Sequence, residues 1–135
     1  MASFIDTNVV VYAYDHGSPG KQERAAHLLG VQADDVVIST QVLSEFYWVV
    51  TRKLAPPLDE AEARHATRLL AALPVVAVDR ALVLAAVDTS RDHRLALWDA
   101  LIVEAAVRSG CDRLVTEDLD HGAVIRGVRI EDPFR

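Results

Sequence analysis

The sequence is short of several features, and each shortage excludes a class of protein. Cys111 is the one cysteine in 135 residues, so the chain forms no internal disulfide and suits a reducing compartment. Lys and Arg total 14 against 20 Asp and Glu, and the net charge of −6 excludes a protein that coats nucleic acid by bulk positive charge. No apolar run approaches the roughly 18 residues of a membrane helix. The first residues do not resemble a signal peptide either, so we expect a cytoplasmic protein without a membrane partner.

What the chain does contain is an alternation of short β-rich runs and longer helical ones. At 51% hydrophobic residues the chain suits one domain with a packed core, so residues 1–135 are interpreted as a single domain. Strands are predicted at 3–5, 36–38, 75–78, 113–115 and 128–130, and helices at 21–29, 40–53, 59–73, 80–87 and 97–109. Buried strands separated by helices predict an α/β fold in which helices flank both faces of a central parallel β-sheet.

Two aspartates lie just past predicted strands. Asp6 directly follows the strand at 3–5, and Asp118 comes shortly after the strand at 113–115. In open parallel sheets, ligands bind beyond the carboxyl ends of the strands, so both residues are at the expected ligand edge. Aspartate also follows strands because it caps helices, and Asp6 could cap a helix that begins at Thr7. For either residue alone, a capping role and a functional role are both open.

Two further carboxylates interrupt apolar helix faces. Glu45 does so in the helix predicted over 40–53, and Asp99 in the helix predicted over 97–109. Burying an unpaired carboxylate is costly, so Glu45 needs an arginine, a metal ion or exposure at the edge of its face. Asp99 could instead be a first-turn acid that the helix dipole stabilises. Glu104, five residues after Asp99, points to another face and is left out of this set.

Together the four carboxylates indicate a metal site. Two of them end strands, and two lie on helix faces that can pack beside those ends. Crowded carboxylates repel one another unless a cation lies among them, and hard oxygen ligands select Mg²⁺ or Mn²⁺. Such a cation orients water and neutralises charge at a phosphoryl group. An acidic protein could in this way act on a polyanion.

At these residues the sequence resembles the PIN-domain ribonucleases. The motifs that carry the resemblance are the Asp-Thr-Asn opening at 6–8, the second-acid helix at 39–46, the third-acid helix at 97–102 and the fourth acid at 116–119. They occur in the order and spacing of the family, over nearly the whole chain. One departure is Ala96, where the family often has a small hydroxyl residue; a lost helix cap costs about 1 kcal/mol.

Within the family, single-domain chains of this length most resemble VapC-like toxins of bacterial toxin–antitoxin pairs. The resemblance implies a single PIN-like domain and an endoribonuclease that depends on Mg²⁺ or Mn²⁺ and cuts RNA. It also implies a homodimer and a small antitoxin that inserts into the active-site groove.

The resemblance further implies a set of site residues. The catalytic carboxylates would be Asp6, Glu45, Asp99 and Asp118. Asp6, Asp99 and Asp118 would bind the metal, while Glu45 would help to position the metal or the attacking water. Hydrogen bonds to these carboxylates would come from Thr7, Asn8 and Thr116. Asp120, in the same loop as Asp118, would be a supporting or solvent-facing acid.

Rival interpretations differ in chemistry. A phosphatase of the haloacid-dehalogenase type needs a second acid two residues after the first, and this chain has Asn8 there. A non-catalytic module of the same fold could bind RNA or protein. An RNA-processing PIN nuclease could lack a toxic role, and a gene for a small DNA-binding antitoxin immediately upstream would favour the toxin.

The remaining candidate residues are assigned structural roles. The histidines show no paired spacing for zinc, and His121 is assigned to a surface turn. Cys111 is assigned to the core. Phe46, Tyr47 and Trp48 are consecutive and cannot form one stacking face, so core or dimer contacts are expected. The chain has no Gly-rich phosphate-binding motif, so nucleotide-cofactor chemistry is not expected.

Overall fold

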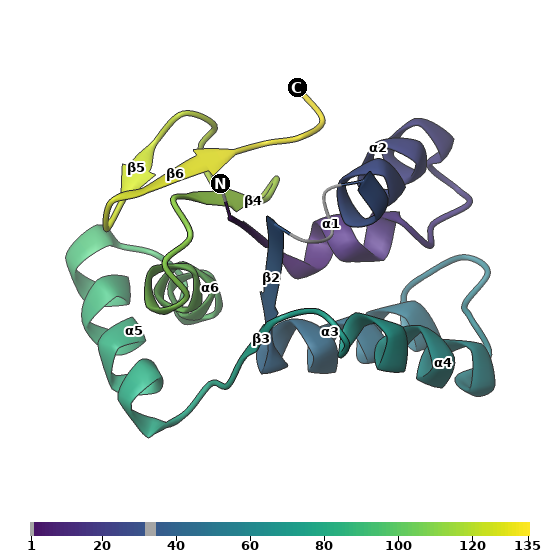
Figure 1. Cartoon of the computed structure of the whole chain (residues 1–135), viewed down its shortest axis with the longest axis horizontal. Helices are drawn as coiled ribbons and strands as arrows, with labels where there is room; N and C mark the ends of the chain where they lie inside the picture. Colours follow the sequence, from purple (N-terminus) through teal and green to yellow (C-terminus); the bar gives the residue numbers. More distant parts are fainter. Residues whose placement is uncertain (1, 32–34) are drawn as a thin grey trace.

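The computed structural model describes residues 2–31 and 35–135, within which helices and strands alternate along most of the chain (Figure 1). The strands are β1 (Ser3–Ile5), β2 (Val36–Ser39), β3 (Val75–Val76), β4 (Arg113–Val115), β5 (Val124–Ile125) and β6 (Val128–Glu131). The helices are α1 (Thr7–Tyr12), α2 (Pro19–Val31), α3 (Thr40–Arg52), α4 (Glu60–Leu70), α5 (Arg80–His93) and α6 (Leu97–Arg108).

The strands form one sheet in the order β3-β2-β1-β4-β6-β5. Strand β1 lies inside the sheet and pairs in parallel with β2 and β4, and the β2–β3 and β4–β6 pairs are also parallel. Helices α5 and α6 lie on one side of this sheet, and α1 to α4 lie on the other (Figure 1). The predicted α/β class with helices on both faces is therefore confirmed. The antiparallel pairing of β5 with β6 makes the sheet mostly rather than wholly parallel.

Strand β5 is missing from the predicted elements, and helix α1 is among them only as an alternative. Strand β5 is too short to show a hydrophobic period, and it forms because Arg126 and Gly127 adopt φ values of 54° and 79°. Two consecutive positive φ angles are typical of a tight hairpin turn, and Arg-Gly is not one of the common sequences for it. Helix α1 confirms the alternative in which Asp6 caps a helix that begins at Thr7.

Some predicted elements begin or end at other residues in the structure. The helix predicted over 80–87 continues to His93, because Thr89 faces the buried side and the chain turns only at Arg94, whose φ is 55°. The helix predicted over 59–73 is shorter at both ends, since Asp59 is its N-cap and its last residue is Leu70. The third strand covers two of the four predicted residues and ends at Val76.

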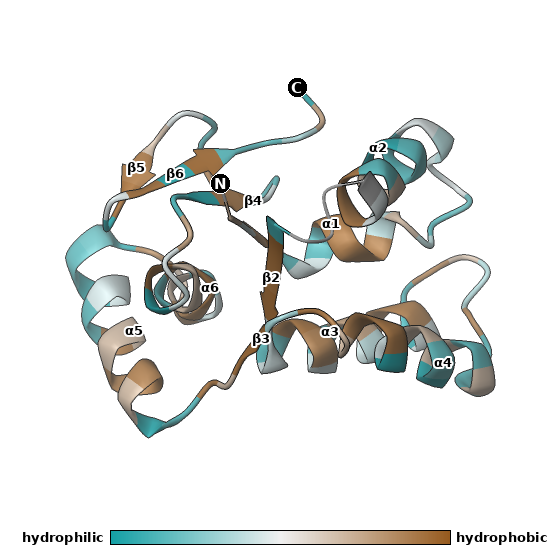
Figure 2. Ribbon diagram, viewed as in Figure 1, coloured by the Kyte–Doolittle hydropathy of each residue, from teal (hydrophilic) through white to brown (hydrophobic). Residues whose placement is uncertain are grey.

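The core lies between the sheet and the helices. Its largest fully buried side chains include Phe4, Ile38, Leu114 and Ile130 from strands and Phe46, Leu82 and Ile102 from helices. Figure 2 shows the same division, with hydrophobic colour along the strands and hydrophilic colour on loops and outer helix turns. Burial of this apolar surface is the main stabilising contribution to the fold.

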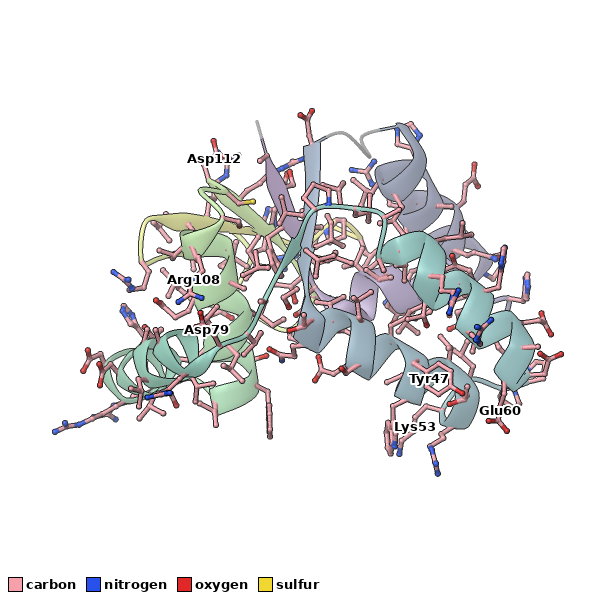
Figure 3. All side chains as sticks on the ribbon, turned by 60° about the horizontal axis from the view of Figure 1, so that its bottom comes forward. Tyr47, Lys53, Glu60, Asp79, Arg108 and Asp112 are labelled. Carbon is pink, nitrogen blue, oxygen red and sulfur yellow. The ribbon has the colours of Figure 1, made fainter. Side chains whose placement is uncertain are left out.

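Helix α6 is the most enclosed of the helices. All residues from Ala100 to Ala106 are buried, because α6 packs on the sheet and α5 covers it. At its far end Arg108 forms an exposed ion pair with Asp79, the N-cap of α5 (Figure 3). Even so, in the described ranges neither α6 nor any other helix is long and apolar enough to cross a membrane. This packing holds the N-terminus of α6, and with it Asp99, at the edge of the sheet.

Candidate metal centre

The candidate site lies where the connections of the sheet change direction. From β1 the chain proceeds to β2 and β3 on one side, and later places β4 on the other side of β1. In open α/β sheets, ligands bind beyond the carboxyl ends of the strands at such a point. Asp6 follows β1, and the loop that carries Asp118 follows β4, so both predicted strand-end acids are at this position.

Asp6 is the most buried carboxylate of the site and is held by two hydrogen bonds. The backbone N–H of Thr7 donates to Oδ1 at 2.6 Å, and the hydroxyl of Thr116 donates to Oδ2 at 2.7 Å. The first of these bonds caps α1. A capping role and a position in the acidic cluster therefore coexist in one residue.

Three of the predicted carboxylates converge. Asp6, Asp99 and Asp118 each place one carboxylate oxygen within 4.8 Å of the others. Asp6 is buried, Asp99 is half-buried and Asp118 is exposed, so the cluster opens to solvent on one side. Hard oxygen donors brought together in this way are typical ligands of Mg²⁺ or Mn²⁺.

Burial and neighbouring carboxylates raise the pKa values of two of the clustered acids. Burial raises the pKa of Asp6 to about 7; the hydrogen bonds from Thr116 and Thr7 offset part of this rise, and the charges of Asp118 and Glu45 add to it. Burial also raises the pKa of Asp99, and the same two neighbouring carboxylates raise it further. No Lys or Arg in the described part of the chain forms an ion pair with any of the three clustered acids. A divalent cation would provide the missing charge.

Glu45 lies beside the cluster rather than within it. Its Oε1 accepts hydrogen bonds from the Thr7 hydroxyl at 2.8 Å and from Gln41 Nε2 at 3.4 Å. Of the three environments expected for Glu45, the structure shows exposure at the edge of the helix face, because the residue is half-buried and lines an open pocket. Thr7 connects the two carboxylates, since its backbone binds Asp6 and its hydroxyl binds Glu45.

The predicted polar residues are arranged around Thr116. This fully buried hydroxyl donates to Asp6 and accepts from Asn8 Nδ2 at 3.2 Å and from the backbone N–H of Asp118 at 3.1 Å. Asn8 Oδ1 is buried and has no partner in the described structure. Asp120 is exposed and does not line the pocket, so the structure does not bring it to the other acids.

The site forms one wall of an open pocket of about 760 Å³. The pocket is also lined by Gln41, Trp48 and Trp98, which the predicted site does not include. Gln41 could have been found from its position one helical turn before Glu45. The sequence predicts a core or dimer contact for Trp48. In the structure this residue is half exposed and lines the pocket, whereas Phe46 is in the core. No pattern in the sequence reports this exposure.

A second acid of the β4 loop is held away from the cluster. Glu117 accepts hydrogen bonds from the Tyr12 hydroxyl at 2.9 Å and from Lys21 Nζ at 3.0 Å.

The structural assignments of Cys111 and His121 agree with the structure: Cys111 is buried, and His121 is exposed and accepts a hydrogen bond from the backbone N–H of Asp132.

Solved structures of toxin–antitoxin proteins share this fold. A toxin–antitoxin complex from Klebsiella pneumoniae matches with a TM-score of 0.74 and 17% identity, over 98% of each chain. DNA-bound VapBC from Salmonella typhimurium matches with a TM-score of 0.70 and 21% identity, over 98% of each chain. Mycobacterium tuberculosis VapC20, described as a toxin that cleaves the sarcin–ricin loop, matches with a TM-score of 0.68 and 19% identity, over 84% of this chain and 87% of that one. At these identities the likeness establishes the fold.

Sequence comparison identifies the family. No curated protein matches this chain significantly. The family model described as the PIN domain matches residues 3–126, a range that contains Asp6, Glu45, Asp99 and Asp118. The order of the acidic motifs and the family match agree, and the chain belongs to the PIN-domain family.

Proposed function

We propose that this protein is a metal-dependent endoribonuclease and the toxin of a toxin–antitoxin pair. The observation that carries the proposal is the convergence of Asp6, Asp99 and Asp118 within 4.8 Å at the ligand-binding edge of the sheet. Membership in the PIN-domain family supports nuclease chemistry, and the structural likeness to toxins of toxin–antitoxin systems supports the biological role.

The metal is Mg²⁺ or Mn²⁺, held by Asp6, Asp99 and Asp118. The all-oxygen donor set fits these ions, and the raised pKa of Asp6, caused first by burial, is the expected property of a ligand without its cation. A divalent cation in this position supplies the positive charge that a phosphodiester needs in an acidic pocket and promotes attack by water at phosphorus.

The residues of the chain supply orientation. Thr116 and the backbone of Thr7 fix both oxygens of Asp6, so this ligand needs no rearrangement when it binds the cation. Glu45, fixed by the hydroxyl of Thr7, is placed to orient the attacking water or to accept its proton. The unpartnered Oδ1 of Asn8 is an available acceptor for a water molecule at the same site.

The proposed partners are an RNA substrate, a cognate antitoxin and a second copy of this chain, in the cytoplasm. The structures reported above include complexes with antitoxins. The acidic pocket is open, and an antitoxin segment that enters it would need to carry positive charge to compensate the clustered carboxylates.

The first experiment tests cleavage. The purified protein and its Asp6→Asn variant are incubated with labelled total RNA in Mg²⁺, in Mn²⁺ and in EDTA. We expect discrete fragments that require metal and are absent with Asp6→Asn. Asp120→Asn is the matched control, because it removes an exposed acid near the cluster and should leave cleavage unchanged.

A negative result separates the alternatives. If the folded, antitoxin-free protein cuts no RNA under any condition, calorimetric titration with Mn²⁺ distinguishes a very narrow substrate range from a binding module. Metal binding without cleavage favours the first, and no metal binding overturns the metal site itself.

The toxin role needs a separate test in cells. Induced expression of the wild-type chain should arrest growth, Asp6→Asn should not, and co-expression of a cognate antitoxin should restore growth. Metal-dependent cleavage in vitro without growth arrest would favour an RNA-processing nuclease instead.

A further inference from the structure

The two tryptophans of the chain line the same pocket as the acidic cluster. Trp48 is 49% exposed and Trp98 is 63% exposed, although large apolar side chains elsewhere in the structure, such as Phe4 and Phe46, are fully buried. Trp48 is on α3 one turn after Glu45, and Trp98 is on α6 directly before Asp99. Each exposed indole therefore belongs to a helix that also carries an acid of the site.

The backbone of Trp98 is held in place although its ring is exposed. Gln41 Nε2 donates to the backbone carbonyl of Trp98 at 3.2 Å and also to Glu45 at 3.4 Å. This amide connects α3 to the start of α6 and leaves the Trp98 ring at the pocket.

Two cationic side chains lie near the Trp48 ring. Lys53 Nζ lies 5.1 Å from the centroid of the Trp48 ring, and the Arg52 guanidinium carbon lies 5.8 Å from it. Lys53 also lines the pocket, and it extends from the C-terminal end of α3 (Figure 3). A base stacked against this ring would have two cations close to its phosphates.

The negative charge of the pocket favours RNA contacts that do not depend on cationic side chains. In the described part of the chain, Lys53 is the one cationic side chain that lines the pocket, against several carboxylates. The long-range field of a chain with a net charge of −6 repels RNA, so phosphate contacts alone bind it weakly. Stacking of a base on an aromatic ring needs no protein charge and contributes about 1–3 kcal/mol per base.

We propose that Trp48 and Trp98 are stacking sites for unpaired bases of the RNA next to the phosphate that is cleaved. The inference rests on the proposed nuclease function and adds the residues that hold the substrate. A base can present its face to an indole only when it is unpaired and unstacked, so these residues would also select against duplex RNA. Arg52 and Lys53 would contact the phosphates on the Trp48 side.

Intrinsic fluorescence provides a direct test, because both tryptophans of the chain lie in the pocket. The Asp6→Asn variant is titrated in Mg²⁺ with a short single-stranded RNA and with the same RNA annealed to its complement. We expect quenching by the single strand and little by the duplex. Trp48→Phe and Trp98→Phe in this background each retain one indole and report the two positions separately.

Alanine variants measure the contribution to binding. In the Asp6→Asn background, Trp48→Ala and Trp98→Ala should each weaken the affinity for single-stranded RNA about tenfold or more, and phenylalanine should restore most of it. Leu69→Ala is the matched control, since Leu69 is an exposed apolar residue outside the pocket. In the active enzyme, the tryptophan variants should raise KM and leave kcat nearly unchanged.

The inference and the proposed function fail in different ways. Metal-dependent cleavage with unchanged KM in the tryptophan variants, or equal binding of single strand and duplex, overturns the stacking sites and leaves the nuclease intact. Specific quenching by RNA without cleavage overturns the nuclease and leaves the stacking sites. If the tryptophan variants lose self-association in sedimentation without losing RNA binding, the rings are covered by a second copy and the inference is wrong.

Discussion

Two carboxylates of this protein are buried to nearly the same extent but in opposite electrostatic environments. Asp6 is 5% exposed and Glu104 is 4% exposed. Glu104 accepts hydrogen bonds from Arg126 Nε at 3.0 Å and from the Thr89 hydroxyl at 2.8 Å, whereas Asp6 accepts only from an amide and a hydroxyl. One buried carboxylate therefore has a cationic partner within the chain, and the other does not.

The pKa values of the two residues differ accordingly. Burial raises the pKa of both, but for Glu104 the hydrogen bonds from Arg126 and Thr89, together with the charges of Arg126 and His93, outweigh burial and bring its pKa below the ordinary value. For Asp6 burial outweighs the hydrogen bonds and raises the pKa to about 7. Burial of an acid is thus not itself a sign of function. A buried acid whose charge no neighbouring side chain compensates indicates a site for a cation.

Helix α6 contains both environments. Asp99 at its start belongs to the uncompensated cluster, and Glu104 five residues later belongs to the compensated one. The same helix therefore places an acid in the cluster at one end and, through Glu104 and Arg126, holds the β5–β6 turn farther along. Substitution of Asp99 should therefore reduce activity, whereas substitution of Glu104 should reduce stability.

The largest expected effect is on activity at Asp99. Asp99→Asn should reduce RNA cleavage by on the order of 1,000-fold, because a metal ligand is lost at the reacting phosphate. Fragment formation measured with labelled RNA checks this result, and circular dichroism should show an unchanged fold. Glu104→Gln is the contrasting variant and should retain cleavage at temperatures where it is folded. Equal loss of activity in both variants would contradict the distinction.

The second effect is on stability at Glu104. Glu104→Gln should lower the free energy of unfolding by about 2 kcal/mol. The loss is smaller than for a fully buried pair because 47% of the Arg126 side chain is exposed. Urea denaturation measures it, with Arg108→Gln as the control that removes the exposed ion pair with Asp79 and should change little. A smaller loss for Glu104→Gln than for the control would show that the buried pair contributes nothing.

The third effect is a pH-dependent change in stability. Loss of the Asp6 charge should raise the free energy of unfolding, whereas loss of the Glu104 charge should lower it. In EDTA, native Asp6 keeps a proton between about pH 4 and 7 that the unfolded chain has released, so stability falls as the pH rises through this window. Above pH 7 the full cost is roughly 4 kcal/mol.

Asp6→Asn removes this charge and should stabilise the protein at pH 8 by about 1–3 kcal/mol, since an amide replaces only part of the hydrogen bonding from Thr116. At pH 4 the gain should disappear. Thermal unfolding at the two pH values, with and without Mg²⁺, measures this difference. Destabilisation of Asp6→Asn at pH 8 in EDTA would show that a cation of the chain already compensates Asp6.

The smallest effect concerns the N-terminus of α6. Ala96 is its N-cap and makes no side-chain hydrogen bond, as expected from the missing hydroxyl. Ala96→Ser should raise the free energy of unfolding by about 1 kcal/mol and leave cleavage unchanged, because it adds a cap without altering Asp99. Denaturation and the cleavage assay test the two parts. A loss of cleavage would indicate that the uncapped N-terminus itself takes part in the site.

Several features of the fold and site were predictable because local chemistry determines them. The alternation of apolar runs with amphipathic ones predicts the layered α/β class, and Asp6 and Asp118 are recognisable as acids at strand ends. The position of Asp99 two residues after the start of a nearly all-apolar helix is likewise visible in the sequence.

Other features required the tertiary structure, since they depend on contacts between distant residues. Glu104 and Arg126 are far apart in the chain, and only packing of the β5–β6 turn beside α6 makes one compensate the other. The exposure of Trp48 and Trp98 likewise depends on what the surrounding helices leave uncovered. The sequence by itself determined which acids could share an edge of the sheet, because the position of an acid at the end of a strand or helix and its side-chain type are local properties. Only the tertiary structure decided which acids lack a cationic partner, because compensation of charge depends on distances in space.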